Sequence, residues 1–456
     1  MVSTIILSLL VLPLALVSTS AQQVFDVSVA GPFHASLASF PSMTIGQGGR
    51  PYLIWQDQSL GRVQVASYGR ESGAIENILS IDDLGGLATS PYPKIVAAGP
   101  NIFAAWIDYG LSGGGSSALA ISYSTDSGEK YSRNLFAPVQ NAWEVDIATD
   151  GTSLFVVWRN STAWEPGTIM FSKLILGTTS FTETKPLMAN SSLNPAITIE
   201  KPNVYVAWVN DTGSLFLRRS TDNGQTFGSI FEIDGGRSAA RSTPRLVSRE
   251  ANVYLVWQSE EADGVHLRFA TSTNNGTSFS EPVDIDEVPG FRADLNPSLS
   301  IGQDDRLYLA WVSYKFYIDS GLTIRAKKAP LSGGSWEEFD VAARKTGKTD
   351  HVQASIVADS SSNFFVLYEL LEERQGSQFR EVRLATSLPI TSPAYWLGQL
   401  FGHPIAGVVL TATALAGSAG AILFLYRRQY GLKPGPSRVF GFLARFLRGR
   451  RRPRKE

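Results

Sequence analysis

A short apolar pattern recurs seven times along the chain: an aromatic residue, two small or apolar residues, and a closing Trp or Tyr. The seven copies are Tyr52–Trp55, Phe103–Trp106, Phe155–Trp158, Tyr205–Trp208, Tyr254–Trp257, Tyr308–Trp311 and Phe365–Tyr368. Successive closing aromatics lie 51, 52, 50, 49, 54 and 57 residues apart. A period near 50 residues that persists from end to end indicates one supersecondary unit repeated in tandem.

Each repeat is predicted to contain four β-strands. In five repeats a Pro stands 13 or 14 residues before the closing Trp, and alternating residues follow it, as in Pro195–Ile199. Pro is tolerated at the first residue of a strand, because the ladder does not yet need its missing N–H. A polar turn at 200–203 leads into the Trp strand, and further strands follow near 214–219 and 228–233. Four strands in about 50 residues are typical of a β-propeller blade.

The Trp strand is apolar on both of its faces, since Trp208 and Val206 alternate with Tyr205 and Ala207. Such a strand needs a covering layer on each side, and a radial stack of sheets supplies both layers. We therefore predict an all-β fold over residues 22–392, a seven-bladed β-propeller, with six blades as the alternative if one hairpin is misassigned. The last repeat lacks a fourth strand, and we expect residues 24–29 to fill that place and close the ring.

The residues flanking the repeats predict a membrane anchor. Residues 1–21 have the apolar run and small-residue cleavage site of a signal peptide, although no basic residue precedes the run, so an uncleaved anchor is the alternative. A linker at 393–403 leads to residues 404–426, which carry no charge and are long enough to cross a bilayer as a transmembrane helix. The segment 427–456 is a basic tail.

Charge is divided unevenly along the chain. Residues 22–403 carry a net charge of −11 and residues 427–456 a net charge of +10. This division predicts a single-pass protein of the cell membrane with an extracellular N-terminal domain and a cytoplasmic C-terminus. Val439, Leu443, Phe446 and Leu447 lie at helical spacing among arginines, which favours either an amphipathic helix on the anionic inner leaflet or a plain positive-inside anchor. The acidic ectodomain argues against nucleic acid as a partner.

The composition predicts no metal and no cofactor. The chain has 456 residues and no Cys, which excludes disulfides and thiolate metal sites. Its four His residues are far apart in the sequence, which argues against a His-based metal site. Without disulfides or thiolate metal sites, the hydrophobic core must supply the stability of the domain.

Three turns between the third and fourth strands share one motif. The turns run from Ser124 to Tyr131, from Ser220 to Phe227 and from Ser272 to Phe279. The predicted structural residues are Ser124, Asp126, Gly128, Ser220, Asp222, Gly224, Phe227, Ser272, Asn274 and Gly276. In each turn the Asp or Asn is expected to accept backbone N–H groups, Gly to supply a positive φ, and the final aromatic residue to re-enter the core.

This motif resembles the Asp-box, or bacterial neuraminidase repeat, and with the Trp strands the ectodomain resembles the sialidase-type propeller superfamily. The resemblance implies that the Asp-box turns lie opposite the catalytic face. It also implies a sialidase set of three Arg, an Asp and a Tyr–Glu pair. The chain lacks the Arg-Ile-Pro string that carries the first Arg, and its loop 31–41 contains no Arg. Sialidases also have six blades, so the sequence argues against exo-sialidase activity.

Candidate ligand-binding residues are polar groups in loops that share one face of a propeller. They follow the Trp strands or lie between blades: Asp57, Asp108, Arg159, Asp211, Arg241, Glu260 and Arg292. Carboxylate and guanidinium groups could bind glycan hydroxyls or a peptide, whereas the plainer interpretation is that strand ends are polar where they meet water. Glycosylation sequons at Asn160, Asn190, Asn210 and Asn275 fit an exposed glycoprotein.

Two functional hypotheses follow from these observations. The first is a non-enzymatic recognition propeller that binds a glycan, a peptide or a neighbouring envelope protein, because the scaffold is complete and no catalytic set is recognisable. The second is a glycan-active hydrolase or lyase that uses carboxylates of the rim. Two carboxylates facing one pocket at glycosidase separation would favour the second hypothesis.

Overall fold

A computed structural model describes 24–30, 38–57, 60–82, 92–108, 117–132, 135–136, 141–162, 165–178, 181–234, 242–285, 292–315, 322–332, 334–341, 349–374 and 377–388. Contacts divide the chain into two units, Met1–Ile390 and Thr391–Glu456, and every described residue belongs to the first unit. Within these ranges no helix is long and apolar enough to cross a membrane. The predicted signal peptide, linker, span and tail lie outside the described residues.

The described chain is almost entirely β-structure, and its helical residues are confined to the 3-10 turn η2 (Gln47–Gly49). The strands are β1 (Phe25–Ala30), β2 (Ala38–Ile45), β3 (Pro51–Asp57), β4 (Arg62–Gly69), β5 (Ala74–Ser80), β6 (Lys94–Ala98), β7 (Asn101–Asp108), β8 (Ala118–Ser124), β9 (Leu135–Phe136), β10 (Ala142–Thr149), β11 (Ser153–Asn160), β12 (Gly167–Ile175), β13 (Lys185–Glu200), β14 (Asn203–Asn210), β15 (Leu215–Ser220), β16 (Phe231–Glu232), β17 (Arg245–Arg249), β18 (Asn252–Glu261), β19 (Gly264–Ser272), β20 (Val283–Asp284), β21 (Arg292–Ile301), β22 (Arg306–Lys315), β23 (Leu322–Pro330), β24 (Glu337–Phe339), β25 (Thr349–Ala358), β26 (Phe364–Arg374) and β27 (Ser377–Thr386).

These strands form antiparallel meanders in chain order. Three sheets have four strands each, in the orders β2-β3-β4-β5, β6-β7-β8-β9 and β1-β27-β26-β25. A seven-stranded sheet runs from β10 to β16, because the long strand β13 pairs with β12 at its start and with β14 further along. An eight-stranded sheet runs from β17 to β24, because β19 forms a short parallel pair with β21. Each predicted aromatic motif lies in the second strand of a meander.

The predicted pairing of the two ends of the domain is confirmed. Strand β1 pairs antiparallel with β27, with Phe25 opposite Thr386 and Val27 opposite Leu384. Asp26 adds side-chain bonds, since its carboxylate accepts from Arg383 Nε at 2.9 Å and from the Tyr368 hydroxyl at 3.0 Å. The first described strand therefore completes the last sheet.

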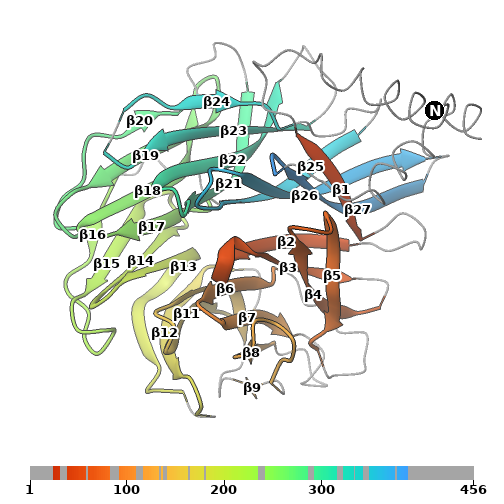
Figure 1. The fold of residues 1–456 in the computed structure, drawn as a ribbon. Helices are drawn as coiled ribbons and strands as arrows, with labels where there is room; N and C mark the ends of the chain where they lie inside the picture. Colours follow the sequence, from red (N-terminus) through yellow and green to blue (C-terminus); the bar gives the residue numbers. More distant parts are fainter. Residues whose placement is uncertain are drawn as a thin grey trace, which may run out of the picture. The chain divides into compact units, whose positions relative to one another are not determined.

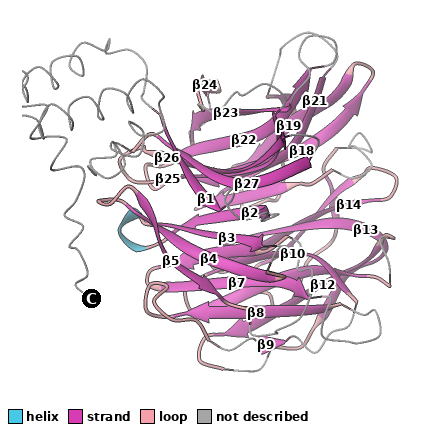
Figure 2. Ribbon diagram, turned by 90° about the vertical axis from the view of Figure 1, so that its right-hand side faces the viewer, coloured by secondary structure: helices cyan, strands magenta, loops and turns pink. Residues whose placement is uncertain are grey.

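The first strands of the meanders surround a common centre (Figure 1). Contacts run from β2 through β6, β10, β13, β17, β21 and β25, and return from β25 to β2. Side chains reach the backbone of the neighbouring first strand: Asp146 accepts from the Ile197 N–H at 3.0 Å and Ser355 from the Met43 N–H at 3.2 Å. Figure 2, turned by 90°, shows β2, β10, β13, β21 and β25 among the other strands, with loops at strand ends.

The Trp strands are buried on both faces, as predicted. In β14, Trp208 and Val206 pack with Phe171 and other residues of the preceding meander. Tyr205 and Ala207 pack with residues of the following meander, among them Trp257. Every Trp of the motif is at most 2% exposed. These aromatic residues are therefore the core between sheets, where each side chain contributes roughly 2–3 kcal/mol of burial.

The three predicted turns share one hydrogen-bond pattern. Ser220 Oγ accepts from the Gly224 N–H at 2.8 Å and donates to Asp222 Oδ1 at 2.7 Å. Asp222 Oδ1 accepts from the Thr226 N–H at 2.8 Å. The turns that begin at Ser124 and Ser272 repeat these bonds. The bonds from Thr226 and Ser220 hold the pKa of Asp222 at about 2.

Substituting Gly224 should show that this turn glycine lies against a neighbouring side chain in addition to having a positive φ. Gly224 has φ 81°, and a Cβ there would lie 2.5 Å from Phe171 Cζ of the preceding meander. We expect Gly224→Ala to lower the free energy of unfolding by about 2 kcal/mol more than Gly48→Ala. Gly48 has φ 69° but no heavy atom within 4 Å of such a Cβ, so it controls for the backbone alone. Urea denaturation measures both, and equal losses would contradict the packing argument.

Candidate functional site

The first strands enclose a central cavity of about 400 Å³. A second hollow of about 230 Å³ shares Lys94, Asp146, Arg245, Asn296 and Gln353 with it. The second hollow, here called the mouth pocket, is lined by Tyr92, Lys94, Glu144, Val145, Asp146, Leu193, Asn194, Pro195, Thr243, Arg245, Asn296 and Gln353. Lys94 and Arg245 are the first residues of β6 and β17, whereas Asn194, Asn296 and Gln353 lie in the middle of β13, β21 and β25.

The mouth pocket is built from residues in an unusual backbone conformation. Tyr92, Glu144, Asn194 and Asn296 have φ of 61°, 47°, 50° and 50°. The strand register shifts at Glu144, Asn194 and Asn296, which makes each a β-bulge. A left-handed φ costs about 1–3 kcal/mol for residues other than Gly, and bulges of this kind re-aim side chains. Pro93, Pro195 and Pro297 follow Tyr92, Asn194 and Asn296 directly, whereas Val145 follows Glu144.

Lys94 and Arg245 lie with Asp146 in the wall of the mouth pocket. Within the described residues no carboxylate oxygen lies within 4.0 Å of Lys94 Nζ or the Arg245 guanidinium. Burial, and then the charge of Arg245, lowers the pKa of Lys94 from 10.5 to about 8, while Asp146 opposes the shift. Burial also lowers the pKa of Arg245, again opposed by Asp146. The wall therefore holds positive charge that no direct ion pair neutralises, which favours an anionic ligand.

The other carboxylate of the pocket is held in place by a buried arginine. Arg159 of β11 is 0% exposed and donates to Glu144 from Nε at 2.9 Å and from Nη2 at 3.0 Å. Its Nη1 donates to the Glu165 carbonyl, and the guanidinium lies 5.7 Å from the centre of the Trp143 ring. Glu144 also accepts from the Asn194 N–H at 2.7 Å. Glu144 thus joins two neighbouring first strands and orders one side of the pocket.

Tyr92 forms an aromatic wall of the pocket. The centre of its ring lies 4.3 Å from that of Phe40 on β2, the first strand of the preceding meander. Burial raises the pKa of Tyr92, and the charges of Glu144 and Glu369 raise it further. The phenol therefore stays protonated at neutral pH and can donate a hydrogen bond or present its ring to a sugar. A tyrosine with a raised pKa is poorly suited to be a nucleophile.

The candidate ligand-binding residues predicted from the sequence are spread over a larger part of the fold than the mouth pocket. Arg159 supports it through Glu144, whereas Asp57, Asp108, Asp211 and Glu260 are not among its lining residues. Asp108 is 0% exposed, Asp57 is half-buried, and Asp211 and Glu260 are exposed at strand ends. Arg241 and the side chain of Arg292 lie outside the described residues. The polar residues beside the repeated prolines were the signal that could have found the pocket.

The predicted glycosylation residues lie on β-structure or in turns. Asn160 ends β11 and is half-buried. Asn210 Oδ1 accepts N–H groups of Thr212 and Ser214, and Asn275 has φ 57° in its turn. The side chain of Asn190 lies outside the described residues. Their modification stays a prediction.

The pH dependence of stability should report the lowered pKa of Lys94. The folded chain releases this proton near pH 8 and an unfolded chain near 10.5, so the unfolded state binds more protons between these values. The free energy of unfolding therefore rises with pH across that window, and the cost of burying the charged Lys94 is fully present below about pH 8. We expect Lys94→Met to raise the free energy of unfolding at pH 7 by about 2 kcal/mol and to remove the rise. Lys328→Met, on β23, is the control and should not stabilise the chain.

No protein-family model matches the sequence, and no curated protein matches it. Among solved structures, the chain is similar to an ulvan lyase of a polysaccharide lyase family bound to -[GlcA(1-4)Rha3S]-, at 10% identity and a TM-score of 0.51, over 76% of this chain and 93% of that one. The phage phi92 endosialidase matches at 10% identity and a TM-score of 0.49, over 81% and 69%. A protein of unknown function from Dyadobacter fermentans matches at 15% identity and a TM-score of 0.48, over 79% and 98%.

The similarity to the ulvan lyase shows a shared fold and nothing about activity. The contacts among the first strands also return to their starting point. Together these observations define the described part of the chain as a β-propeller.

Proposed function

We propose that the chain is a closed seven-bladed propeller of the sialidase type that binds a carboxylate-bearing saccharide at the mouth pocket. The observation that carries the proposal is the placing of Lys94 and Arg245 in one wall with no direct ion pair among the described residues. Tyr92 supplies an aromatic face, and Thr243, Asn296 and Gln353 supply polar groups. A cation, an aromatic ring and several polar side chains in a hollow match the carboxylate, the apolar face and the hydroxyls of an acidic sugar.

Isothermal titration of the full-length chain with a glucuronic acid oligosaccharide tests this function. We expect Arg245→Met to weaken binding at least about tenfold, which is 1.4 kcal/mol. Arg249→Met is the matched control, because Arg249 lies on the same strand in an exposed pair with Asp305 at 2.7 Å. Affinity should also fall as the pH rises through about 8, where Lys94 loses its charge. Equal binding of a neutral oligosaccharide of the same length would reject the proposal.

Lyase chemistry is the second candidate, and the pKa of Lys94 near 8 favours it. A neutral Lys94 amine would remove the proton on the carbon next to the sugar carboxylate, while Arg245 stabilises the charge that develops on that carboxylate. The neighbouring C–O glycosidic bond then breaks to leave a C=C bond, and the Tyr92 hydroxyl would donate a proton to the leaving oxygen. Ultraviolet absorbance of an unsaturated product, lost in Lys94→Met, would support this candidate. Binding of the oligosaccharide without formation of an unsaturated product would indicate a recognition module without lyase activity.

We also propose that the propeller is held outside the cell by a span at residues 404–426, with the basic tail on the inner leaflet. The uncharged segment and the division of charge along the chain support this. Protease treatment of intact cells should digest the propeller and spare the tail.

A further inference from the structure

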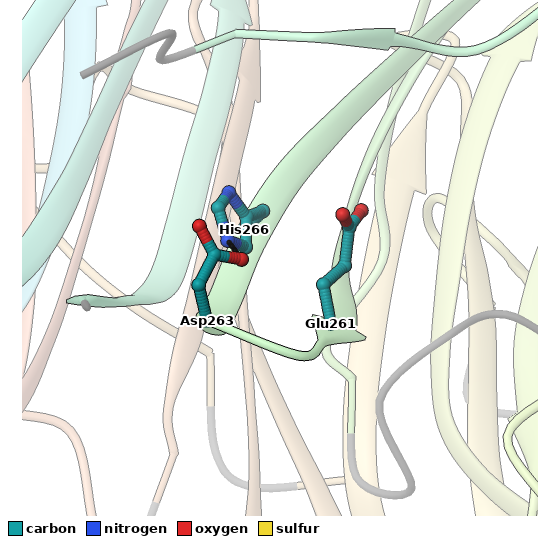
Figure 3. Close-up of side chains that lie close together, drawn as sticks. All are labelled: Glu261, Asp263 and His266. Carbon is teal, nitrogen blue, oxygen red and sulfur yellow. Dashed lines mark hydrogen bonds and ion pairs between the residues drawn. The ribbon is translucent and has the colours of Figure 1, made fainter. Parts of the chain in front are cut away.

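A histidine and three carboxylates gather at one hairpin of the fifth meander. Glu261 ends β18, Asp263 stands in the turn, and His266 follows near the start of β19. Figure 3 shows the Asp263 and His266 side chains close together, with the Glu261 side chain to one side on the neighbouring strand. One possible ligand atom from each lies within 4.8 Å of the others. Asp284 of β20 approaches the same ring from its other nitrogen. None of these residues lines the mouth pocket, so the group has no part in the function proposed above.

Both nitrogens of the His266 ring face carboxylate oxygens. Nε2 lies 2.9 Å from Asp263 Oδ1, and Nδ1 lies 3.3 Å from Asp284 Oδ2. A neutral imidazole has one donor and one acceptor nitrogen, so it can donate to only one of the two carboxylates, whereas a cation at the acceptor nitrogen would balance the other carboxylate. His266 is 5% exposed, so water does little to screen these charges.

The arrangement on the Nδ1 side matches that of a metal-binding histidine. Such a histidine donates its second N–H to a carboxylate, which sets the tautomer and the ring orientation. Asp284 stands in that place, while Nε2 is at hydrogen-bond distance from Asp263 Oδ1, 2.9 Å, and an ion bound to Nε2 would replace that bond. Arg268 orients Glu261, since Nε donates at 3.0 Å and Nη2 also donates to the same oxygen, Oε1.

The charges also favour a divalent ion. Glu261, Asp263 and Asp284 bring three negative charges to one hairpin, and Arg268 brings one positive charge. One imidazole nitrogen with carboxylate oxygens suits Zn²⁺ or Mn²⁺, whereas Ca²⁺ and Mg²⁺ prefer oxygen ligands alone. Asp263 is 57% exposed on its side chain, so an ion has an open path from solvent.

We propose that Glu261, Asp263 and His266 bind one divalent transition-metal ion, Zn²⁺ or Mn²⁺, with Asp284 holding the histidine in place. The ion would join the tip of the β18–β19 hairpin. Through Asp284 it would also fix β20, which comprises only Val283 and Asp284 and pairs with β19. The site would thereby stiffen the strand edge where β19 meets β21.

The test uses the full-length chain, stripped with a chelator and then titrated separately with Zn²⁺, Mn²⁺ and Ca²⁺ in a calorimeter. We expect one Zn²⁺ or Mn²⁺ per chain, a rise in Tm with that ion, and much weaker binding of Ca²⁺. Asp263→Asn and His266→Asn should weaken binding at least about tenfold, and Asp284→Asn by about 10–100-fold. Glu260→Gln removes one charge from the same hairpin outside the group and should bind as the unchanged chain does.

Three outcomes would overturn the proposal. One is no binding of Zn²⁺ or Mn²⁺ to the unchanged chain. The second is an equal loss in Glu260→Gln and Asp263→Asn, which would indicate a general charge effect. The third is unaltered binding in Asp263→Asn and His266→Asn, which would place the ion elsewhere. Circular dichroism of each variant separates misfolding from loss of the site.

Discussion

Replacing Arg159 with alanine is expected to lower the free energy of unfolding by about 3–5 kcal/mol. Arg159 is fully buried, and its guanidinium holds Glu144 through bonds of 2.9 and 3.0 Å. Without it, Glu144 would remain in a bulge with φ 47° beside the cavity, with no counter-charge from Arg159. The bond from the Asn194 N–H to Glu144 would weaken with it, and so the contact between two first strands would loosen.

Chemical denaturation followed by tryptophan fluorescence measures this loss. Arg249→Ala is the matched control, because the Arg249–Asp305 pair has side chains 41% and 67% exposed. An exposed pair of this kind contributes at most about 1 kcal/mol. The double variant Arg159→Met with Glu144→Gln removes both charges and should recover most of the loss. A loss below about 1 kcal/mol in Arg159→Ala would show that Glu144 does not depend on this partner.

Asp26→Ala is expected to lower the free energy of unfolding by about 3 kcal/mol, because it opens the point where the two ends of the propeller meet. Asp26 lies on β1 and accepts from Arg383 of β27 at 2.9 and 3.0 Å, and from the Tyr368 hydroxyl. Burial opposes the charge of Arg383, but the nearby carboxylates of Asp26 and Glu381 raise its pKa overall. Since Glu381 remains at 2.7 Å, Arg383 keeps one partner and the loss stays below that of Arg159→Ala.

Denaturation should be combined with hydrogen exchange for this variant. The amides of β1 are expected to exchange faster in Asp26→Ala, while those of β14 keep their protection relative to the global stability. Glu337→Ala serves as the control, because its carboxylate is 67% exposed and lies 3.6 Å from Lys328. Equal exchange across all strands would mean that β1 is not a separate point of weakness.

Much of the fold could be predicted from local patterns. The aromatic–Trp strand recurs near every 50 residues and is apolar on both faces, so its pattern alone requires a covering layer on each side. The turn at Ser220 needs only its own eight residues to form its hydrogen bonds. The place of the strand at 24–29 also followed, because the last repeat lacked one strand and an unpaired edge is costly.

The mouth pocket could not be predicted in the same way. It depends on a left-handed φ at Tyr92, Glu144, Asn194 and Asn296, and a register shift of this kind is not visible in hydropathy. Arg159 was singled out as a rim residue, but its partner Glu144 is 15 residues away and meets it only because β10 and β11 pair across that bulge.

The hairpin group shows the same limit at shorter range. The wide spacing of the histidines along the sequence argued against a His-based metal site. The structure instead brings one histidine together with the carboxylates of Glu261, Asp263 and Asp284.

The sequence by itself determined the repeated unit, the doubly buried strand and the turns, because each of these depends on residues within a few positions of one another. Only the tertiary structure decided which polar side chains meet. Lys94 and Arg245 come from β6 and β17, about 150 residues apart, and share a cavity because the first strands surround one centre. Closure of the ring sets those distances, and closure depends on all the sheets together.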